Sequence, residues 1–147
     1  MPNPILDQIE FFSEEIAFDL PNQDVVRLWI YETIQSEQKK LTGLNFIFCS
    51  DEYLYQMNLE YLKHDTYTDV ITFPYSETTV EGDVFISLDR VNDNAFYHKV
   101  HQMEELHRVI IHGVLHLIGY KDESADEEKT MRTKEDLYLK KFPLPFS

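Results

Sequence analysis

The sequence is poor in positive charge, in glycine and in cysteine. Its 13 Lys and Arg residues stand against 27 Asp and Glu residues, so the formal net charge is −14. Proteins that bind nucleic acid through a broad basic surface depend on Lys and Arg to release counterions from phosphates, so that class is excluded. A polyanionic partner must instead be met by a local basic patch or by a metal ion.

Cys49 is the one cysteine, so the chain has neither an internal disulfide nor a second thiol for a zinc ribbon. It is the last residue of the strand-like run from Asn45, and we expect a buried structural thiol. No run approaches the roughly 20 apolar residues of a membrane span, and residues 1–5 lack the basic and apolar regions of a signal peptide. We therefore expect a cytoplasmic protein with no membrane partner.

Glycine and proline are also scarce, with four and six residues among 147, and no repeat or low-complexity linker divides the chain. Hydrophobic residues make up 43% of the sequence, enough for a folded core beneath an acidic surface. We predict one domain spanning residues 1–147.

Strand and helix patterns alternate over the first two thirds of the chain, and helical patterns close it. One or two short strands are expected within 9–18, and single strands at 45–49, 70–74 and 83–87. Helices are expected at 22–40, 51–61, 88–97 and 102–118, and a last one after the capping box Ser124–Glu127. This order predicts an α/β (α+β) fold: a single compact domain whose small mixed sheet packs against helices.

The helix expected at 102–118 is apolar around most of its circumference and carries one polar stripe. At about 100° per residue, the stripe consists of Glu105, Arg108, His112 and His116. A buried polar group without a partner costs about 1 to 3 kcal/mol, so the stripe must face partners, a cleft or a metal.

His112 and His116 lie one turn apart, so both imidazoles can reach one ion at about 2.0–2.1 Å. Two hydrogen-bonded core histidines would show the same spacing. However, Gly119 ends the helix and Asp122 follows, as in open catalytic sites with three protein ligands and water. The sequence therefore predicts a metal site on a buried helix, formed by these three side chains. Gly113 stands where His-Glu-x-x-His metalloproteases have their general base, so peptide hydrolysis by that route is not supported.

Three segments extend this pattern. The first is the run His112 to Asp122, which reads HGVLHLIGYKD; the second is Asn58-x-x-Tyr61 followed by DTYTDVITFP at 65–74; and the third is GDVFIS at 82–87. Together they resemble the YbeY family of bacterial endoribonucleases and rRNA maturation factors.

The resemblance implies a small α/β domain with a mixed sheet and one Zn²⁺ per chain, at the positions of His112, His116 and Asp122. It also implies cleavage of single-stranded or ribosomal RNA in small-subunit rRNA 3′-end maturation and in ribosome quality control. The implied partners are RNA and the ribosome or a ribosomal protein, not DNA.

The sequence departs from the family pattern at the third ligand, where Asp122 replaces a histidine. A carboxylate is a competent zinc ligand, but its charge neutralises part of the ion's charge. We therefore expect a weaker Lewis acid, or a preference for a different divalent metal.

A second departure is Leu62, which stands where the family has an arginine linked with catalysis. Arg108 and Lys63 are the candidates for the missing charge. Against these roles, Arg108 has Glu104 and Glu105 as potential ion-pair partners, and Lys63 fits a solvated loop.

Other residues receive more modest expectations. Asp69 and Asp83 are candidates for orienting the ligand imidazoles, with capping or turn roles as the alternative. His107 is expected to be structural or exposed, and His64, His98 and His101 lack ligand spacing. Base stacking or rim packing is expected of four tyrosines: Tyr53, Tyr61, Tyr67 and Tyr75.

Three functions remain open at this point. The first is metal-dependent RNA cleavage, in which either metal-bound water or the 2′-hydroxyl attacks the phosphodiester. The second is an accessory ribosome-assembly factor with a structural metal. The third is a metal-dependent hydrolase of small substrates, which the acidic surface keeps open. In the first case, the charge predicts weak and salt-sensitive binding to free RNA.

Overall fold

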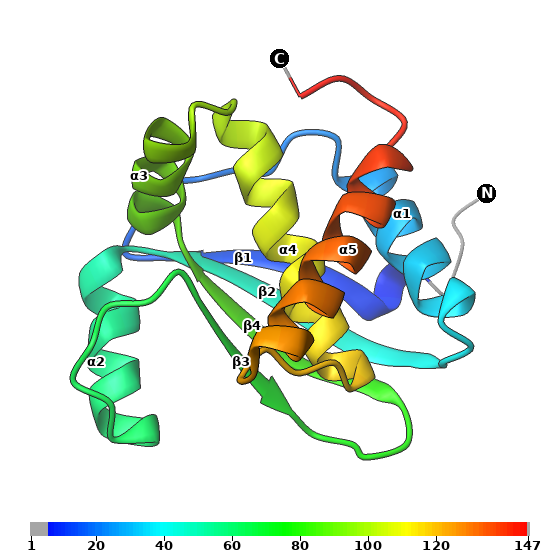
Figure 1. The fold of residues 1–147 in the computed structure, drawn as a ribbon. Helices are drawn as coiled ribbons and strands as arrows, with labels where there is room; N and C mark the ends of the chain where they lie inside the picture. The colour runs from blue at the N-terminus through cyan, green and yellow to red at the C-terminus, as the bar shows by residue number, and fades with distance from the viewer. Residues whose placement is uncertain (1–5, 147) are drawn as a thin grey trace.

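The computed structural model describes residues 6–146, so the expectation for residues 1–5 lies outside this part. Figure 1 shows the ribbon, with strands gathered into one sheet and helices on both sides of it. In chain order, the elements are a 3₁₀ turn η1 Leu6–Gln8, β1 Ile9–Glu14, α1 Gln23–Ser36, β2 Leu41–Cys49, α2 Asp51–Leu62, β3 Val70–Pro74, β4 Val80–Ser87, α3 Leu88–His98, α4 Gln102–Ile118 and α5 Ala125–Lys140.

The four strands form one mixed sheet in the order β1-β2-β4-β3. β1, β2 and β4 run parallel, whereas β3 pairs antiparallel with β4 at the edge of the sheet. The predicted α+β fold with a small mixed sheet is confirmed.

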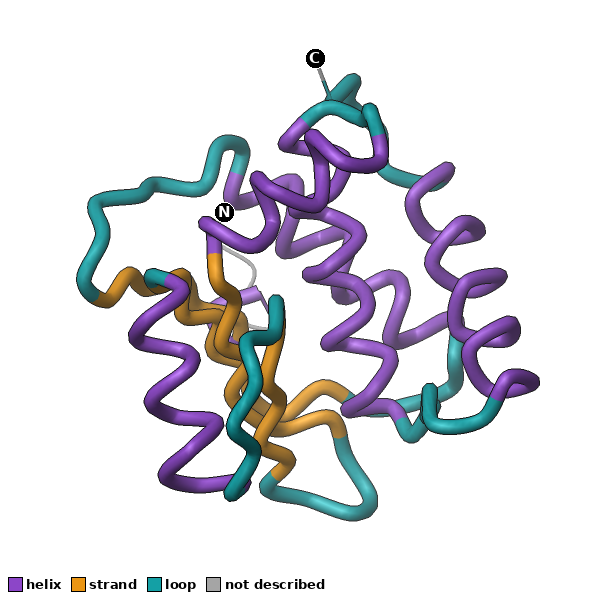
Figure 2. The backbone as a smooth tube through the Cα atoms, turned by 60° about the vertical axis from the view of Figure 1, so that its left-hand side comes forward, coloured by secondary structure: helices purple, strands orange, loops and turns teal. Residues whose placement is uncertain are grey.

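Helices cover the two faces of the sheet unequally. α4 crosses one face with α1 and α5 beside it, and α2 lies alone on the other face (Figures 1 and 2). Because strand side chains alternate, Phe46 and Val84 point into the large core under α4, whereas Cys49 joins a smaller cluster under α2. Cys49 is fully buried as predicted, and burial raises the pKa of its thiol to about 12.

The predicted boundaries failed mainly around the turn after α1. That helix ends at Ser36 rather than near 40, because Gln38 takes a left-handed φ of 59° and turns the chain. β2 then begins at Leu41, not 45, because it extends its pairing with β4 as far as Val80. A local pattern does not reveal this pairing, since the partner strand lies almost 40 residues away.

Gly113 lets α4 approach the sheet closely. A Cβ at this position would lie 2.8 Å from Cγ1 of Val84, nearer than ordinary carbon contacts allow. The packing of α4 on the sheet therefore requires a residue without a side chain at this position. A glutamate, the general base of His-Glu-x-x-His metalloproteases, would not fit here. Within residues 6–146, no helix combines the length and apolar character that crossing a bilayer requires.

Candidate metal site

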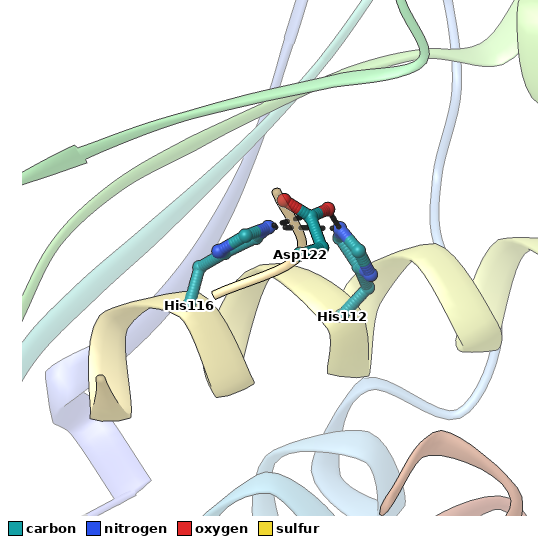
Figure 3. A group of neighbouring side chains, drawn as sticks. All are labelled: His112, His116 and Asp122. Carbon is teal, nitrogen blue, oxygen red and sulfur yellow. Dashed lines mark hydrogen bonds and ion pairs between the residues drawn. The ribbon is translucent and has the colours of Figure 1, made fainter. Parts of the chain in front are cut away.

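The predicted trio of ligands comes together at the end of α4. His112 and His116 project from successive turns of the helix, and Asp122 returns to them from the loop that follows (Figure 3). Nε2 of His112 lies 3.0 Å from Nε2 of His116, and Oδ2 of Asp122 lies 3.3 Å and 3.2 Å from these two atoms. Ligand atoms in a tetrahedral zinc site are about 3.3 Å apart, because each bond is about 2.0–2.1 Å long. The observed triangle therefore has the size of three corners of such a site.

The second nitrogen of each imidazole is already engaged. Nδ1 of His116 lies 3.0 Å from the backbone carbonyl oxygen of Tyr120, and Nδ1 of His112 lies 2.6 Å from Oε2 of Glu135. A carbonyl or carboxylate oxygen accepts hydrogen bonds, so in the neutral form of each imidazole Nδ1 carries the proton and Nε2 keeps a lone pair. Two lone pairs and a carboxylate oxygen thus face one common point, an arrangement that suits a cation.

The carboxylates around His112 favour positive charge at this point, whether from a proton or from a metal ion. Burial disfavours its charged form, but the carboxylates of Glu135 and Asp122 outweigh burial, and the pKa of His112 is raised. The exposed fractions of the three ligand side chains lie between 20% and 38%, so the group borders solvent. The residues present fit one divalent metal ion with an open position.

Glu135 is the part of the site that sequence reasoning missed. It is 5% exposed on α5, and its carboxylate binds both His112 and Nη1 of Arg108, the latter at 3.0 Å. Burial raises its pKa, but these two partners outweigh burial and lower it. The available signal was its place on the apolar stripe of α5, where it alternates at helical spacing with Met131, Tyr138 and Leu139.

Arg108 is connected to the candidate site through residues of α5. Its guanidinium donates to Glu135 and, at 2.8 Å, to Asp136. Its ion pairs are thus made with α5 and not with Glu104 or Glu105. Because both partners hold the guanidinium, Arg108 supports His112 through Glu135.

Lys63, the other candidate cation, is exposed in a left-handed conformation at the end of α2. Its amine donates to the carbonyl oxygen of Glu60 at 3.2 Å. Lys63 thus has the solvated loop position that was the alternative to a role at the site.

Neither aspartate proposed as an orienting group has that role. Asp83 accepts hydrogen bonds from Asn45 at 3.0 Å and Tyr75 at 2.7 Å, and no described contact joins it to the ligands. Asp69 lines the cleft beside the ligands, where burial raises its pKa and attraction to His112 partly offsets the rise. The orienting groups are the Glu135 carboxylate and the Tyr120 carbonyl.

Two clefts meet at the ligands. One, of about 350 Å³, lies along the β3 edge and is lined by Leu62, His64 and Asp69 as well as all three ligands. The other, of about 500 Å³, runs along α5; its lining includes His112, Asp122, Lys129 and Arg132. A substrate in either cleft would lie against the open side of the trio.

The four tyrosines lie away from these clefts. Tyr53, Tyr61 and Tyr75 line a cavity of about 650 Å³ beneath α2, on the opposite face of the sheet. Tyr67 stacks on Tyr55 with 4.3 Å between ring centroids. Tyr61 and Tyr75 are each 60% exposed, so base stacking by these rings stays a prediction, at a place away from the candidate ligands.

The fold and the site together define a class: an α+β domain with three potential metal ligands on a helix that crosses a mixed sheet. The sequence profile of the family described as "Endoribonuclease YbeY" matches residues 8–143. The chain belongs to this family.

Individual relatives agree along nearly the whole chain. Proteins called "Endoribonuclease YbeY" from Amoebophilus asiaticus (strain 5a2) and Cytophaga hutchinsonii are 50% and 49% identical to it. The matches cover 89% and 92% of this chain, and 90% and 98% of those proteins. A solution structure of a Thermotoga maritima protein has a TM-score of 0.66 at 27% identity, covering 91% of this chain and 88% of that one.

Proposed function

We propose that this chain is a metal-dependent endoribonuclease that cleaves single-stranded RNA. Its place is cytoplasmic rRNA processing, at the 3′ end of the small-subunit rRNA, and ribosome quality control, with the ribosome or a ribosomal protein as partner. Membership of the YbeY family supports the endoribonuclease activity. The observation that carries the proposal is the trio His112, His116 and Asp122, whose potential ligand atoms lie within 4.8 Å of one another beside two open clefts.

The trio would hold one divalent ion, and two imidazoles with one carboxylate suit Zn²⁺. When bound, such an ion acts as a Lewis acid and acidifies water. The protein's own task is orientation: Glu135 and the Tyr120 carbonyl hold the two imidazoles with Nε2 facing inward. Arg108 in turn holds Glu135. Because Asp122 is anionic, other divalent ions remain part of the proposal.

Metal analysis combined with RNA cleavage tests this function. We expect about one metal ion per wild-type chain, and cleavage of single-stranded but not duplex RNA. His112→Ala should lose both the metal and the cleavage. His98→Ala is the matched control, because His98 is an exposed histidine on α3 outside the lining of both clefts. A wild-type protein that binds no metal would refute the site.

The chemistry of the RNA products separates the two routes of attack. Attack by the 2′-hydroxyl leaves 2′,3′-cyclic phosphate ends, whereas direct attack by water leaves none. End-group analysis of the fragments therefore identifies the nucleophile.

A second function is favoured by one observation, the apolar Leu62 in the cleft lining where the family carries an arginine. A ribosome-assembly factor with a structural metal needs no cation there. Metal at one per chain without RNA cleavage would identify this function. Hydrolysis of a small phosphodiester with no action on RNA would instead identify the third alternative, a hydrolase of small substrates.

A further inference from the structure

The two clefts beside the trio differ in their cationic side chains. In the cleft along β3, Leu62 is apolar, and His64 is the one basic side chain in the lining apart from the ligands. The cleft along α5 contains two permanent cations, Lys129 and Arg132, although its lining also includes three carboxylates: Asp122, Glu128 and Glu135. A guanidinium is always charged, and its planar fork matches two phosphate oxygens. The α5 cleft is therefore the better equipped to hold a phosphate beside the metal ligands.

Arg132 is free to bind a ligand although its backbone is fixed. Its neighbour Met131 is 2% exposed, and Glu135, one turn further along α5, is 5% exposed, so the helix is anchored on both sides of it. The Arg132 side chain, in contrast, is 63% exposed. Its one ion-pair contact among the described residues is with Oε1 of Glu135 at 3.9 Å, close to the limit for such a pair.

Glu135 has little need of Arg132 as a partner. It already binds Arg108 at 3.0 Å and His112 at 2.6 Å. To bind the Arg132 guanidinium, a phosphate of a nucleic acid would have to replace only the 3.9 Å ion pair with Glu135. Arg132 also lines the same cleft as two of the candidate ligands, His112 and Asp122.

We propose that Arg132 binds a phosphate of the RNA substrate next to the trio, and so supplies the positive charge that Leu62 cannot. This inference rests on the proposed function, because it takes RNA as the substrate. It assigns the cationic role to α5, about 70 residues further along the chain than position 62. Neither Lys63 nor Arg108 is needed for it.

RNA binding in the presence of a chelator tests the contact without any contribution from cleavage. The probe is a fluorescent single-stranded oligouridylate, titrated at several salt concentrations with wild type, Arg132→Gln and Arg132→Lys. Each phosphate contact on a single strand contributes about 0.7 to the slope of log K against log salt, so Arg132→Gln should lower the slope by about that amount. Its affinity at low salt should fall by about tenfold, and Arg132→Lys should lie between the two.

Two further variants separate a local contact from general electrostatics. Lys99→Gln removes the same charge from an exposed position at the end of α3 and should leave the slope and the affinity near those of wild type. His64→Leu probes the other cleft and should have a smaller effect than Arg132→Gln. Thermal unfolding should be unchanged for Arg132→Gln, because that side chain is exposed.

Cleavage by the metal-loaded protein completes the test. Arg132→Gln should lower kcat/KM about tenfold or more and retain its metal. The inference would be overturned if Arg132→Gln bound and cleaved RNA as wild type does, with the same salt slope. It would also be overturned if Lys99→Gln lowered RNA affinity as much as Arg132→Gln, or if His64→Leu lowered it more. A wild-type protein that neither binds nor cleaves RNA would overturn the proposed function itself, and the inference with it.

Discussion

At the scale of single residues, Glu135 connects the candidate metal ligand His112 to the last helix. One of its oxygens accepts from Nδ1 of His112 and the other from Arg108. Carboxylates in this position fix the orientation of a ligand imidazole and increase its basicity. The quality of the site thus depends on a residue 23 positions away from the histidine that it holds.

Glu135→Gln should weaken Zn²⁺ binding by about tenfold to a hundredfold, because the amide is neutral and a poorer acceptor for His112. Competition with a chromophoric chelator measures the affinity. Asp136→Asn is the matched control, since Asp136 also binds Arg108 but has no described contact with His112. An equal loss in both variants would assign the effect to Arg108 and contradict a direct role of Glu135.

His107 is a second residue whose surroundings determine its behaviour. It is 4% exposed and packs against the rings of Trp29, Phe142 and Phe146. Nδ1 pairs with the carbonyl oxygen of Met103, whereas Nε2 is buried without a partner among the described residues. The expected structural role is confirmed. Burial lowers its pKa, and the hydrogen bond to Met103 offsets only part of this effect.

This lowered pKa predicts a loss of stability in acid. The unfolded chain binds the His107 proton more readily than the folded one, so the free energy of unfolding falls as the pH drops below about 6.5 toward the folded-state pKa. Urea unfolding of wild type and His107→Leu at pH 8 and pH 5 measures the difference. Wild type should lose stability relative to the variant on acidification, and parallel behaviour of the two proteins would contradict the prediction.

At the scale of elements, the contact between α4 and β4 sets the position of the ligand-bearing helix. Gly113→Ala places a methyl group 2.8 Å from Cγ1 of Val84. Overpacking of this kind costs about 1–3 kcal/mol, against a gain in helix propensity of about 1 kcal/mol. The variant should be destabilised, and Gly113→Ala with Val84→Ala should show favourable coupling in a double-mutant cycle.

Gly43→Ala provides the control for this cycle. Its nearest contact would be the Cγ of Glu81 at 3.9 Å, an ordinary distance, so its effect should be small. Additive effects of the changes at 113 and 84 would show that the close approach does not control the packing of α4.

Features that depend on residues close together in the sequence could be predicted, whereas features that depend on residues far apart in the sequence could not. α4 was predicted at its observed bounds, Gln102–Ile118, because its apolar pattern and its terminating glycine are local. The trio His112, His116 and Asp122 could be selected as a candidate metal site because its members lie within eleven residues of one another. The start of β2, the end of α1 and the contact between Glu135 and His112 depend on pairing or packing across the fold. Local periodicity cannot locate such partners.

At the scale of the whole molecule, the residues of the candidate site come from consecutive elements of the last third of the chain. His112 and His116 belong to the helix packed on the sheet, Asp122 to the loop after it, and Glu135 to α5. With a net charge of −14, the molecule also carries strong self-repulsion, to which the Asp122 and Glu135 carboxylates contribute. A bound cation would relieve this repulsion and connect α4 to the loop that leads into α5.

Metal binding should therefore stabilise the folded chain measurably. A ligand that binds only the folded state adds about 2.7 kcal/mol when its free concentration is 100 times Kd. Wild type loaded with Zn²⁺ should melt at a higher temperature than the same protein in chelator, and Asp122→Ala should lose most of this difference. Asp126→Ala, a change in the first turn of α5, is the control and should retain it. An Asp122→Ala protein that responds to metal as wild type does would show that the loop does not contribute a ligand, because the stabilisation would then come from the histidines alone.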